Sequence, residues 1–403
     1  MQQALLETLL DKGETAFHES IQRRWPLDAE AAFGALPTPL RLHADPRFTG
    51  RGVTIALVDA GFFPHDDLVR AHGLAGEIGR LRAWADATRA PVTVRRFAAG
   101  ETPRWPGWDA GAPGQWHGLM TSAAAAGSGA RSHGFYRGVA PDAGLVLVQV
   151  ADERGRIGND AIARALRWLG LHAPALGVRV VSLSLGGDPV EPLRGNPVDE
   201  AVAALVRQGV TVVAAAGNDG ERRLVPPGTA PDALTVGGLD DRNTLDHAQR
   251  ALWHGNYGLA SDGRPKPELV APSLWVVAPL LPGTEIAAEA AHLFGGRARG
   301  DASVEPRLGA LKLVTPHYQH VEGTSFAAPL VAGVVACMLE ANPRLTPGRI
   351  RELLVASAHP VLGASTERQG AGALDAGQAV ALALGDLRPA DVVSAAEPAA
   401  GRH

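Results

Sequence analysis

Cysteine is almost absent from this chain of 403 residues, which contains one, Cys337. A single cysteine excludes a framework of disulfides within the chain. Cys337 lies in a long apolar run, so we expect it to pack in the interior as a small hydrophobic residue.

A strong charge of either sign is also missing. Lys and Arg number 38 and Asp and Glu number 42, which gives a formal net charge of -4. Neither this balance nor any block of basic residues indicates a surface for nucleic acid or for an anionic membrane. We therefore expect no nucleic-acid partner and no membrane partner.

Signals for export and membrane insertion are missing as well. The N-terminal sequence MQQALLETLLDKGE has no basic region, and Glu7 and Asp11 interrupt its apolar residues. This is not the pattern of a signal peptide. We find no apolar stretch long enough to span a bilayer. These features predict a soluble protein of the cytoplasm.

The chain does contain a regular alternation of two kinds of segment. Five runs of β-branched and apolar residues end in polar residues or glycine, as buried strands do where they lead into loops. Amphipathic segments at 159–172 and 196–209 are predicted to be helices. This alternation indicates an α/β fold, a doubly wound and mostly parallel sheet with helices on both faces. The five runs are 50–61, 144–152, 178–187, 209–220 and 232–240.

One domain over residues 46–385 accounts for this alternation. Residues 1–45 are interrupted by prolines and are interpreted as an N-terminal extension. Residues 386–403 are rich in Ala, Pro and charge and are interpreted as a flexible tail. Residues 281–318 interrupt the alternation of strands and helices with glycines and scattered charges, which predicts an insertion or a long surface loop.

The stretch VEGTSFAAPLVAGVVACML, residues 321–339, places Ser325 where an apolar helix begins. A serine at this place commonly caps the helix. A helix N-terminus also offers amides and a positive dipole end to a developing anion, so Ser325 is equally a candidate nucleophile. A seryl hydroxyl needs a base, and a group that orients the base, before it reacts.

Two polar residues follow predicted strands. Asp59 comes directly after the run 53–58, and Asn218 comes after the run 210–216 and Gly217. Functional residues of open α/β sheets gather at the carboxyl ends of the strands. Asp59 is therefore a candidate to orient the base, although a carboxylate here can also simply cap a loop.

His117, in WHGLMTSAAAAGSG, is the candidate base. The small residues after it place it at the start of a helix, and Gly118 permits the close approach of another backbone. The competing histidines are His65, His133 and the pair His317 and His320. The pair has a spacing that suits a metal, but no cluster of further ligands accompanies it, so it is kept only as a weak alternative to our prediction of no metal.

Seven sequence blocks occur in a fixed order, namely VTIALVDAG, HGLMTS, GVAPDAGLVLVQV, SLSLGG, VVAAAGNDG, KPELVAP and GTSFAAP. With these blocks the chain resembles the subtilisin-like serine proteases, the subtilase family, over about residues 46–385. GTSFAAP is the most specific block. The order Asp, His, Ser differs from that of chymotrypsin-like enzymes and of α/β-hydrolases.

The resemblance implies a parallel α/β sandwich and endopeptidase activity on polypeptide substrates. It implies that Ser325 attacks the scissile carbonyl, that His117 accepts and returns the proton, and that Asp59 holds the imidazole. It also implies that the Ser325 backbone N–H and the Asn218 side-chain amide receive the oxyanion.

The resemblance further implies where the substrate lies. An extended peptide finds backbone partners at a strand edge. Taken alone, SLSLGG is only a buried strand that ends in a turn, and the order of the blocks is what favours a substrate wall. The two sides of the specificity pocket are then Ser184, Leu185 and Gly186, and Ala215, Ala216 and Gly217.

The chain departs from the family pattern at two positions. Ala60 follows the acid, and Leu119 follows His117 and Gly118, where the family usually has Ser or Thr at both places. Both changes remove a hydroxyl near the reacting side chains but keep Asp59, His117 and Ser325 themselves. Calcium sites are frequent in the family, but adjacent acids such as Asp66 and Asp67 are usually only solvated, and we commit to no cofactor.

Three hypotheses for function remain at this point. The first is an active intracellular serine endopeptidase. The second is a catalytically weak or silent subtilisin-like fold that binds peptides, which Ala60 and Leu119 keep open. The third, an α/β-hydrolase or esterase, is disfavoured because no G-x-S-x-G elbow surrounds Ser325. The sequence does not name the natural substrate or the oligomeric state.

Overall fold

The computed structural model describes residues 35–71, 79–108, 111–112, 114–189 and 195–385. Its main sheet contains β1 (Thr54–Asp59), β2 (Leu81–Asp86), β3 (Thr93–Arg96), β4 (Gly144–Gln149), β5 (Val178–Leu183), β6 (Thr211–Ala215), β7 (Leu234–Asp240), β8 (Ala251–Leu252) and β11 (Leu269–Pro272). The strands follow the order β11-β7-β6-β5-β1-β4-β2-β3, and β8 pairs with β7. All neighbours are parallel except the pairs β2-β3 and β7-β8.

The predicted fold class is confirmed, because the five predicted strands are β1, β4, β5, β6 and β7 and all of them run parallel. The two predicted helices are α7 (Asn159–Leu176) and α8 (Pro197–Arg207). The Asn196 side chain accepts a hydrogen bond from the Val198 amide, and Pro197 occupies the first helical position. These two residues explain where α8 begins.

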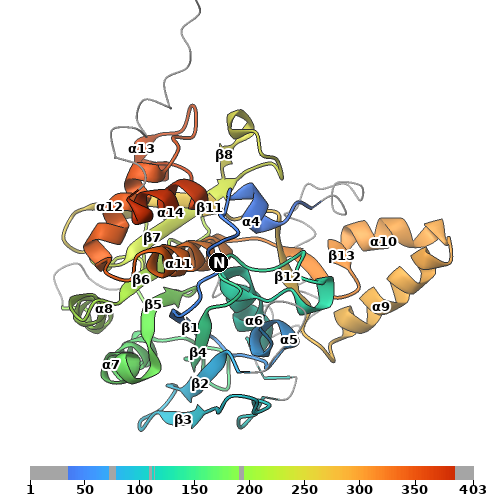
Figure 1. Ribbon diagram of the computed structural model, residues 1–403, viewed down its shortest axis with the longest axis horizontal. Helices are drawn as coiled ribbons and strands as arrows, with labels where there is room; N and C mark the ends of the chain where they lie inside the picture. The colour runs from blue at the N-terminus through green and yellow to red at the C-terminus, as the bar shows by residue number, and fades with distance from the viewer. Residues whose placement is uncertain (1–34, 72–78, 109–110, 113, 190–194, 386–403) are drawn as a thin grey trace, which may run out of the picture.

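The central strand is buried on both faces. In β1, Ile55 and Leu57 belong to one hydrophobic core and Ala56 and Val58 to the other. This alternation is the period of a strand whose two faces are both covered. Helices α7 and α8 lie side by side on one face (Figure 1). The other face carries α6 (Gln115–Ala126), α11 (Thr324–Ala341), α12 (Pro347–Ser357) and α14 (Ala376–Leu384).

Helix α11 runs through the core that contains Ile55 and Leu57. By length and composition it is apolar enough to cross a membrane, and 89% of it is buried inside the protein. Our expectation that no apolar stretch is long enough to span a bilayer is therefore wrong for α11. The helix is apolar all round because the core of the protein surrounds it. Cys337 packs within it, as predicted, and burial raises the pKa of its thiol to about 12.

Residues 281–318 are not a long irregular loop. They contain α9 (Glu285–Ala298), η3 (Ala302–Val304), α10 (Glu305–Ala310), β13 (Leu313–Thr315) and the start of β14 (Tyr318–Val321), which pairs with β12 (Val276–Pro279). The helices form because Ile286, Leu293 and Leu308 bury one another in a small separate core. Figure 1 shows α9 and α10 projecting away from the sheet. That this segment is an insertion stays a prediction.

The predicted extension and tail lie mostly outside the described residues, at 1–34 and 386–403. The described end of the extension forms α4 (Thr38–Arg41). The Arg41 side chain is fully buried, and its Nη1 lies 2.5 Å from Oδ2 of Asp241. This pair attaches the segment to the loop after β7. The remaining elements named below are α5 (Asp66–Val69), η1 (Ala130–Ser132) and η2 (His247–Gln249).

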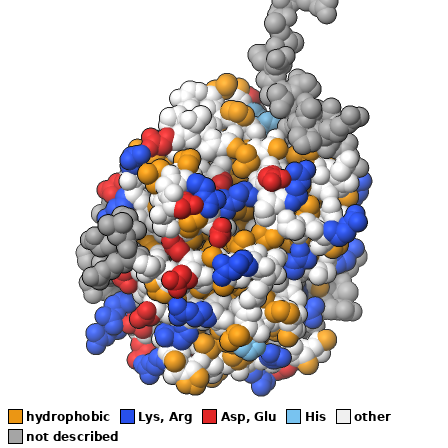
Figure 2. Space-filling view, turned by 90° about the vertical axis from the view of Figure 1, so that its left-hand side faces the viewer, with side chains coloured by type: hydrophobic (Ala, Val, Ile, Leu, Met, Phe, Trp, Pro, Cys, Tyr) orange, Lys and Arg blue, Asp and Glu red, His pale blue; other side chains and the backbone are white. Residues whose placement is uncertain are grey.

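Acidic and basic side chains are interspersed on the face shown in Figure 2. This arrangement agrees with the nearly balanced charge of the sequence.

Candidate active site

Asp59 and His117 form the centre of the candidate site. Asp59 ends β1, and His117 lies in the first turn of α6. His117 Nδ1 is 2.6 Å from Asp59 Oδ1. The Asp59 carboxylate is buried, with 1% of the residue exposed. A carboxylate on Nδ1 fixes the tautomer in which Nε2 carries the lone pair, which is the form a general base needs.

Glycines allow α6 to approach the loop after β1. A Cβ on Gly118 would lie 1.9 Å from the carbonyl oxygen of Gly61. Gly114 has φ +77°, and a Cβ there would lie 2.4 Å from the Cβ of Ala60. Any other residue would push the helix, and the His117 ring with it, away from Asp59. The predicted close approach at Gly118 is confirmed.

Thr121 is a site residue that the sequence analysis missed. Its hydroxyl donates to Asp59 Oδ2 at 2.8 Å, while the Ala60 amide donates to Oδ1 at 2.7 Å. Thr121 is four residues after His117 and so projects from the same helix face. This i, i+4 spacing within HGLMT was the available signal. Leu119 instead points into the core and is 0% exposed.

Ser325 is the second residue of α11 and is 2% exposed. The N-cap position is Gly323, which has φ +127°, and no side chain caps this helix start. The helix-cap interpretation of Ser325 is therefore wrong. The next residue, Phe326, has its ring centroid 6.0 Å from that of His117. The first turn of α11 thus lies beside the histidine.

Asn218 is attached to the same helix start. Its Oδ1 accepts hydrogen bonds from the amide and the hydroxyl of Thr324, at 2.9 and 2.8 Å. These two donors orient the side-chain amide and leave Nδ2 as its donor group. A Cβ on Gly323 would lie 3.4 Å from Nδ2. Glycine at 323 therefore keeps the space next to this donor open.

The two predicted substrate walls lie next to each other. Leu183 of β5 is in register with Ala214 of β6, so the residues after both strands emerge side by side. Leu185 is 3% exposed and its side chain belongs to the core. Any contact of Leu185 with a substrate is thus limited to its backbone. Ser184 and Gly186 follow β5, Ala215 ends β6, and Ala216 and Gly217 come directly after it. That these residues line a substrate pocket stays a prediction.

Comparisons with known proteins identify the family of this chain. The profile of the Subtilase family matches residues 50–375. The chain belongs to the subtilase family. This subtilase is 30% identical over 340 residues to "Serine protease AprX" of Bacillus subtilis (strain 168), which covers 82% of this chain and 67% of AprX. It is 28% identical over 328 residues to "Subtilisin BL" of Lederbergia lenta, which covers 81% of this chain and 90% of the relative.

Solved structures share the fold. "Sphericase" superposes with a TM-score of 0.56 at 23% identity, over 81% of this subtilase and 90% of that chain. The protease domain of PatA superposes with a TM-score of 0.58 at 22% identity, over 85% of this chain and 99% of that one.

The other candidate histidines have different surroundings. His65 caps α5 by accepting a hydrogen bond from the Asp67 amide. His133 adopts φ +51° in the turn after η1. His320 is buried with its ring against Trp275, at 5.6 Å, and His317 lies in the turn before β14. Both Asp59 oxygens are already engaged by His117, Thr121 and the Ala60 amide, so none of the four replaces His117.

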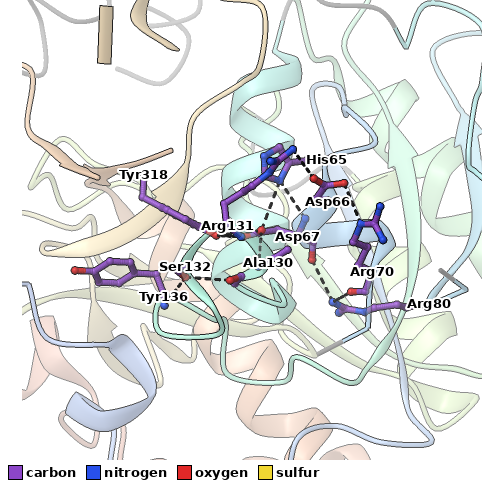
Figure 3. Close-up of polar contacts among 11 residues, drawn as sticks. His65, Asp66, Asp67, Arg70, Arg80, Ala130, Arg131, Ser132, Tyr136 and Tyr318 are labelled. Atoms are coloured by element: carbon purple, nitrogen blue, oxygen red, sulfur yellow. Dashed lines mark hydrogen bonds and ion pairs between the residues drawn. The ribbon is translucent and has the colours of Figure 1, made fainter. Parts of the chain in front are cut away.

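The adjacent acids Asp66 and Asp67 are not simply solvated. Asp67 is buried and accepts hydrogen bonds from the Tyr318 hydroxyl at 2.9 Å and from the Ala130 amide at 3.0 Å (Figure 3). Burial raises the pKa of its carboxyl to about 6. Asp66 forms an ion pair with Arg131 at 2.7 Å. The expectation of two hydrated carboxylates is wrong for Asp67, because β14 and η1 close over it.

Proposed function

We propose that this subtilase is a serine endopeptidase that hydrolyses polypeptides through an acyl-enzyme intermediate. The observation that carries the proposal is the contact of 2.6 Å between His117 Nδ1 and Asp59 Oδ1, next to the helix start that bears Ser325. A base oriented by a carboxylate and placed near a serine is the arrangement that activates a hydroxyl.

The chemistry then follows from the positions of these groups. Ser325 Oγ adds to the scissile carbonyl while His117 Nε2 takes its proton. Asp59 stabilises the imidazolium that forms, through the hydrogen bond on Nδ1. His117 returns the proton to the leaving amine, and a water molecule, deprotonated by the same nitrogen, hydrolyses the acyl-enzyme.

The negative charge on the carbonyl oxygen develops next to two donors. One is the Ser325 backbone N–H at the start of α11, and the other is Nδ2 of Asn218. Donors that are already oriented cost no reorganisation when the charge forms. Thr324 supports this role because its amide and hydroxyl hold the opposite end of the Asn218 amide.

The substrate is proposed to be an extended polypeptide. Residues 184–186 and 215–217 supply backbone groups at the ends of two adjacent strands. A peptide that lies between them binds chiefly through main-chain hydrogen bonds, as in strand addition.

The alternative, a silent peptide-binding fold, rested on the missing hydroxyls at Ala60 and Leu119. The hydrogen bond from Thr121 to Asp59 supplies a hydroxyl from another position and favours the endopeptidase instead.

A fluorophosphonate probe tests the proposal, since it reacts covalently with an activated serine. We expect the wild-type chain to be labelled and the Ser325→Ala and His117→Ala variants to be unlabelled. Ser303→Ala, which changes an exposed serine between α9 and α10, is the matched control and should label normally. A folded wild-type chain that the probe does not label would overturn the endopeptidase proposal in favour of the silent fold.

A further inference from the structure

Three histidines and an aspartate from distant parts of the sequence meet away from the candidate active site. His43 follows α4, His247 begins η2, His359 follows α12, and Asp375 caps α14. His43 Nδ1 lies 2.9 Å from Asp375 Oδ2, and His359 Nε2 lies 3.3 Å from the same oxygen. The His247 ring centroid is 5.0 Å from that of His43 and 4.8 Å from that of His359.

The ligand atoms of this cluster converge on one place. His43, His247 and Asp375 each offer one atom, and these atoms lie within 4.8 Å of one another. Bonds of about 2.0–2.1 Å to a tetrahedral zinc ion would place neighbouring ligand atoms roughly 3.3 Å apart. The contact between His43 Nδ1 and Asp375 Oδ2 is already shorter than that, so the adjustment that remains is a closer approach of the His247 nitrogen to these two atoms.

The surroundings orient the carboxylate for this purpose. Asp375 Oδ1 accepts the Gln378 amide at 2.8 Å, as an N-cap, and this bond turns Oδ2 toward the histidines. The Asp375 side chain is 4% exposed, whereas the His43 and His359 side chains are 36% and 25% exposed. The carboxylate is thus fixed in the interior, while a metal ion can reach the rings from solvent. Ligands held by further hydrogen bonds are typical of built metal sites.

The backbone is also shaped to bring these segments together. The Leu42 carbonyl accepts the Ala376 amide at 2.9 Å. A Cβ on Gly377 would lie 2.5 Å from the His43 carbonyl oxygen. The segment after α4 therefore lies directly on the start of α14, and His43 reaches Asp375 with little freedom.

The charged groups around the cluster are Asp375 and Arg250. Arg250 is buried, at 8% exposed, and interacts electrostatically with both Asp375 and Asp241. Its positive charge is therefore partly balanced by two carboxylates.

We propose that His43, His247, His359 and Asp375 form a binding site for one divalent transition-metal ion of the zinc class. Imidazole with one carboxylate selects zinc and its neighbours, whereas calcium prefers an all-oxygen set. The bound ion would join the N-terminal segment after α4 to η2 and to the start of α14. This inference does not depend on the proposed protease activity.

Zinc binding to the full chain tests this proposal. The protein is treated with a chelator, the chelator is removed, and Zn²⁺ is titrated in competition with a chromophoric indicator. We expect one Zn²⁺ per chain. In His43→Ala and in His247→Ala the affinity should fall by more than the roughly 10- to 100-fold that loss of outer-shell support alone costs. His292→Ala, which removes an exposed histidine on α9, is the matched control and should bind like the wild type.

Thermal unfolding gives a second readout. Since a ligand that binds the folded state stabilises it, Zn²⁺ should raise the unfolding temperature of the wild type and of His292→Ala, and should raise that of His247→Ala less at the same Zn²⁺ concentration. His247 is half-buried on a short surface helix, so this variant keeps the measurement interpretable if Asp375→Asn does not fold. No zinc binding by the wild type, or equal binding by all the variants, would overturn the proposal.

Discussion

The Thr121 hydroxyl and the Asp59 carboxylate are joined by a hydrogen bond of 2.8 Å. Thr121 lies one helical turn after His117, so the helix that carries the histidine also holds the acid in place. The family usually has a hydroxyl directly after the acid, where this chain has Ala60. In this subtilase the hydroxyl that supports Asp59 comes instead from Thr121, on the helix that carries His117.

Replacing Thr121 by Val should lower kcat/KM by about 10- to 100-fold. A hydrogen bond to a charged group contributes roughly 1.5–3 kcal/mol, and about 1.4 kcal/mol corresponds to a factor of ten. Thr121→Ser should recover most of the rate. The control is Ser122→Ala, since the Ser122 hydroxyl is buried and has no hydrogen-bond partner among the described residues. Steady-state cleavage of a peptide substrate measures the effect, and equal rates for Thr121→Val and Ser122→Ala would contradict the role of Thr121.

Replacing Asn218 by Ala should reduce kcat by about 100- to 1000-fold while the fold persists. This magnitude is the one known for loss of a side-chain oxyanion donor in subtilisin itself. Thr324→Val should cause a smaller loss, because the amide of residue 324 still holds Asn218 Oδ1. Single-turnover acylation measures the loss of rate, and thermal unfolding of the same samples shows whether the fold persists. Wild-type acylation by Asn218→Ala would exclude it as a donor.

The stability of the wild type should depend little on His65 and Asp67 between pH 4 and 6. The pKa of Asp67 rises from 3.8 to about 6 on folding, so its contribution to the unfolding free energy falls as pH rises through this range. The pKa of His65 falls from 6.5 to about 4 on folding, mainly through burial, so its contribution rises with pH. The two slopes therefore oppose each other.

Single variants should reveal each slope. Relative to the wild type, Asp67→Asn should become more stable as pH rises from 4 to 6, and His65→Asn should become less stable, each by roughly 1–3 kcal/mol. Urea unfolding at several pH values measures both differences. Parallel curves for the wild type and the two variants would show that the buried pair does not titrate in this way.

Removing one member of the pair Arg41 and Asp241 should be strongly destabilising. Both side chains are buried, at 0% and 2% exposed, and Arg41 also donates to the Trp275 carbonyl. Asp241→Ala should lower the free energy of unfolding by about 3–5 kcal/mol, because it leaves a buried guanidinium unpaired.

The pair Arg47 and Asp45 lies nearer the surface and is the matched control for this experiment, since the Arg47 and Asp45 side chains are 72% and 19% exposed. Asp45→Ala should cost no more than about 1 kcal/mol. Guanidinium unfolding compares the two variants. Similar losses for both would mean that α4 is not held to the domain through Arg41.

The sequence was informative where a local pattern matches a local structure. The apolar runs predicted β1, β4, β5, β6 and β7, and the chemistry of the strand ends singled out Asp59 and Asn218. His117 was a candidate base because the small residues after it predicted a helix start and Gly118 a close approach, which occurs against Gly61, and the family resemblance then selected it. Apart from that selection, each of these inferences uses neighbouring residues only.

The contacts that sequence reasoning missed join residues far apart in the chain. Thr121 and Asp59 are 62 residues apart, and Asp67 and Tyr318 are 251 apart. No periodicity relates such positions, so Asp67 was taken for a hydrated acid. The cluster around Asp375 was missed for the same reason, since its histidines come from three separate segments.

The contacts of helix α11 have a consequence for how this protein is inactivated by heat. Ser325, the proposed nucleophile, lies at the start of a buried helix that contacts β5, β6, β7 and β11 as well as α6 and α14. A methyl group added at Gly333 would already lie 2.8 Å from the Ala125 oxygen. Heat should therefore abolish the proposed activity only when the whole domain unfolds. Local unfolding of the peripheral α9–α10 hairpin should leave the Ser325 hydroxyl in position.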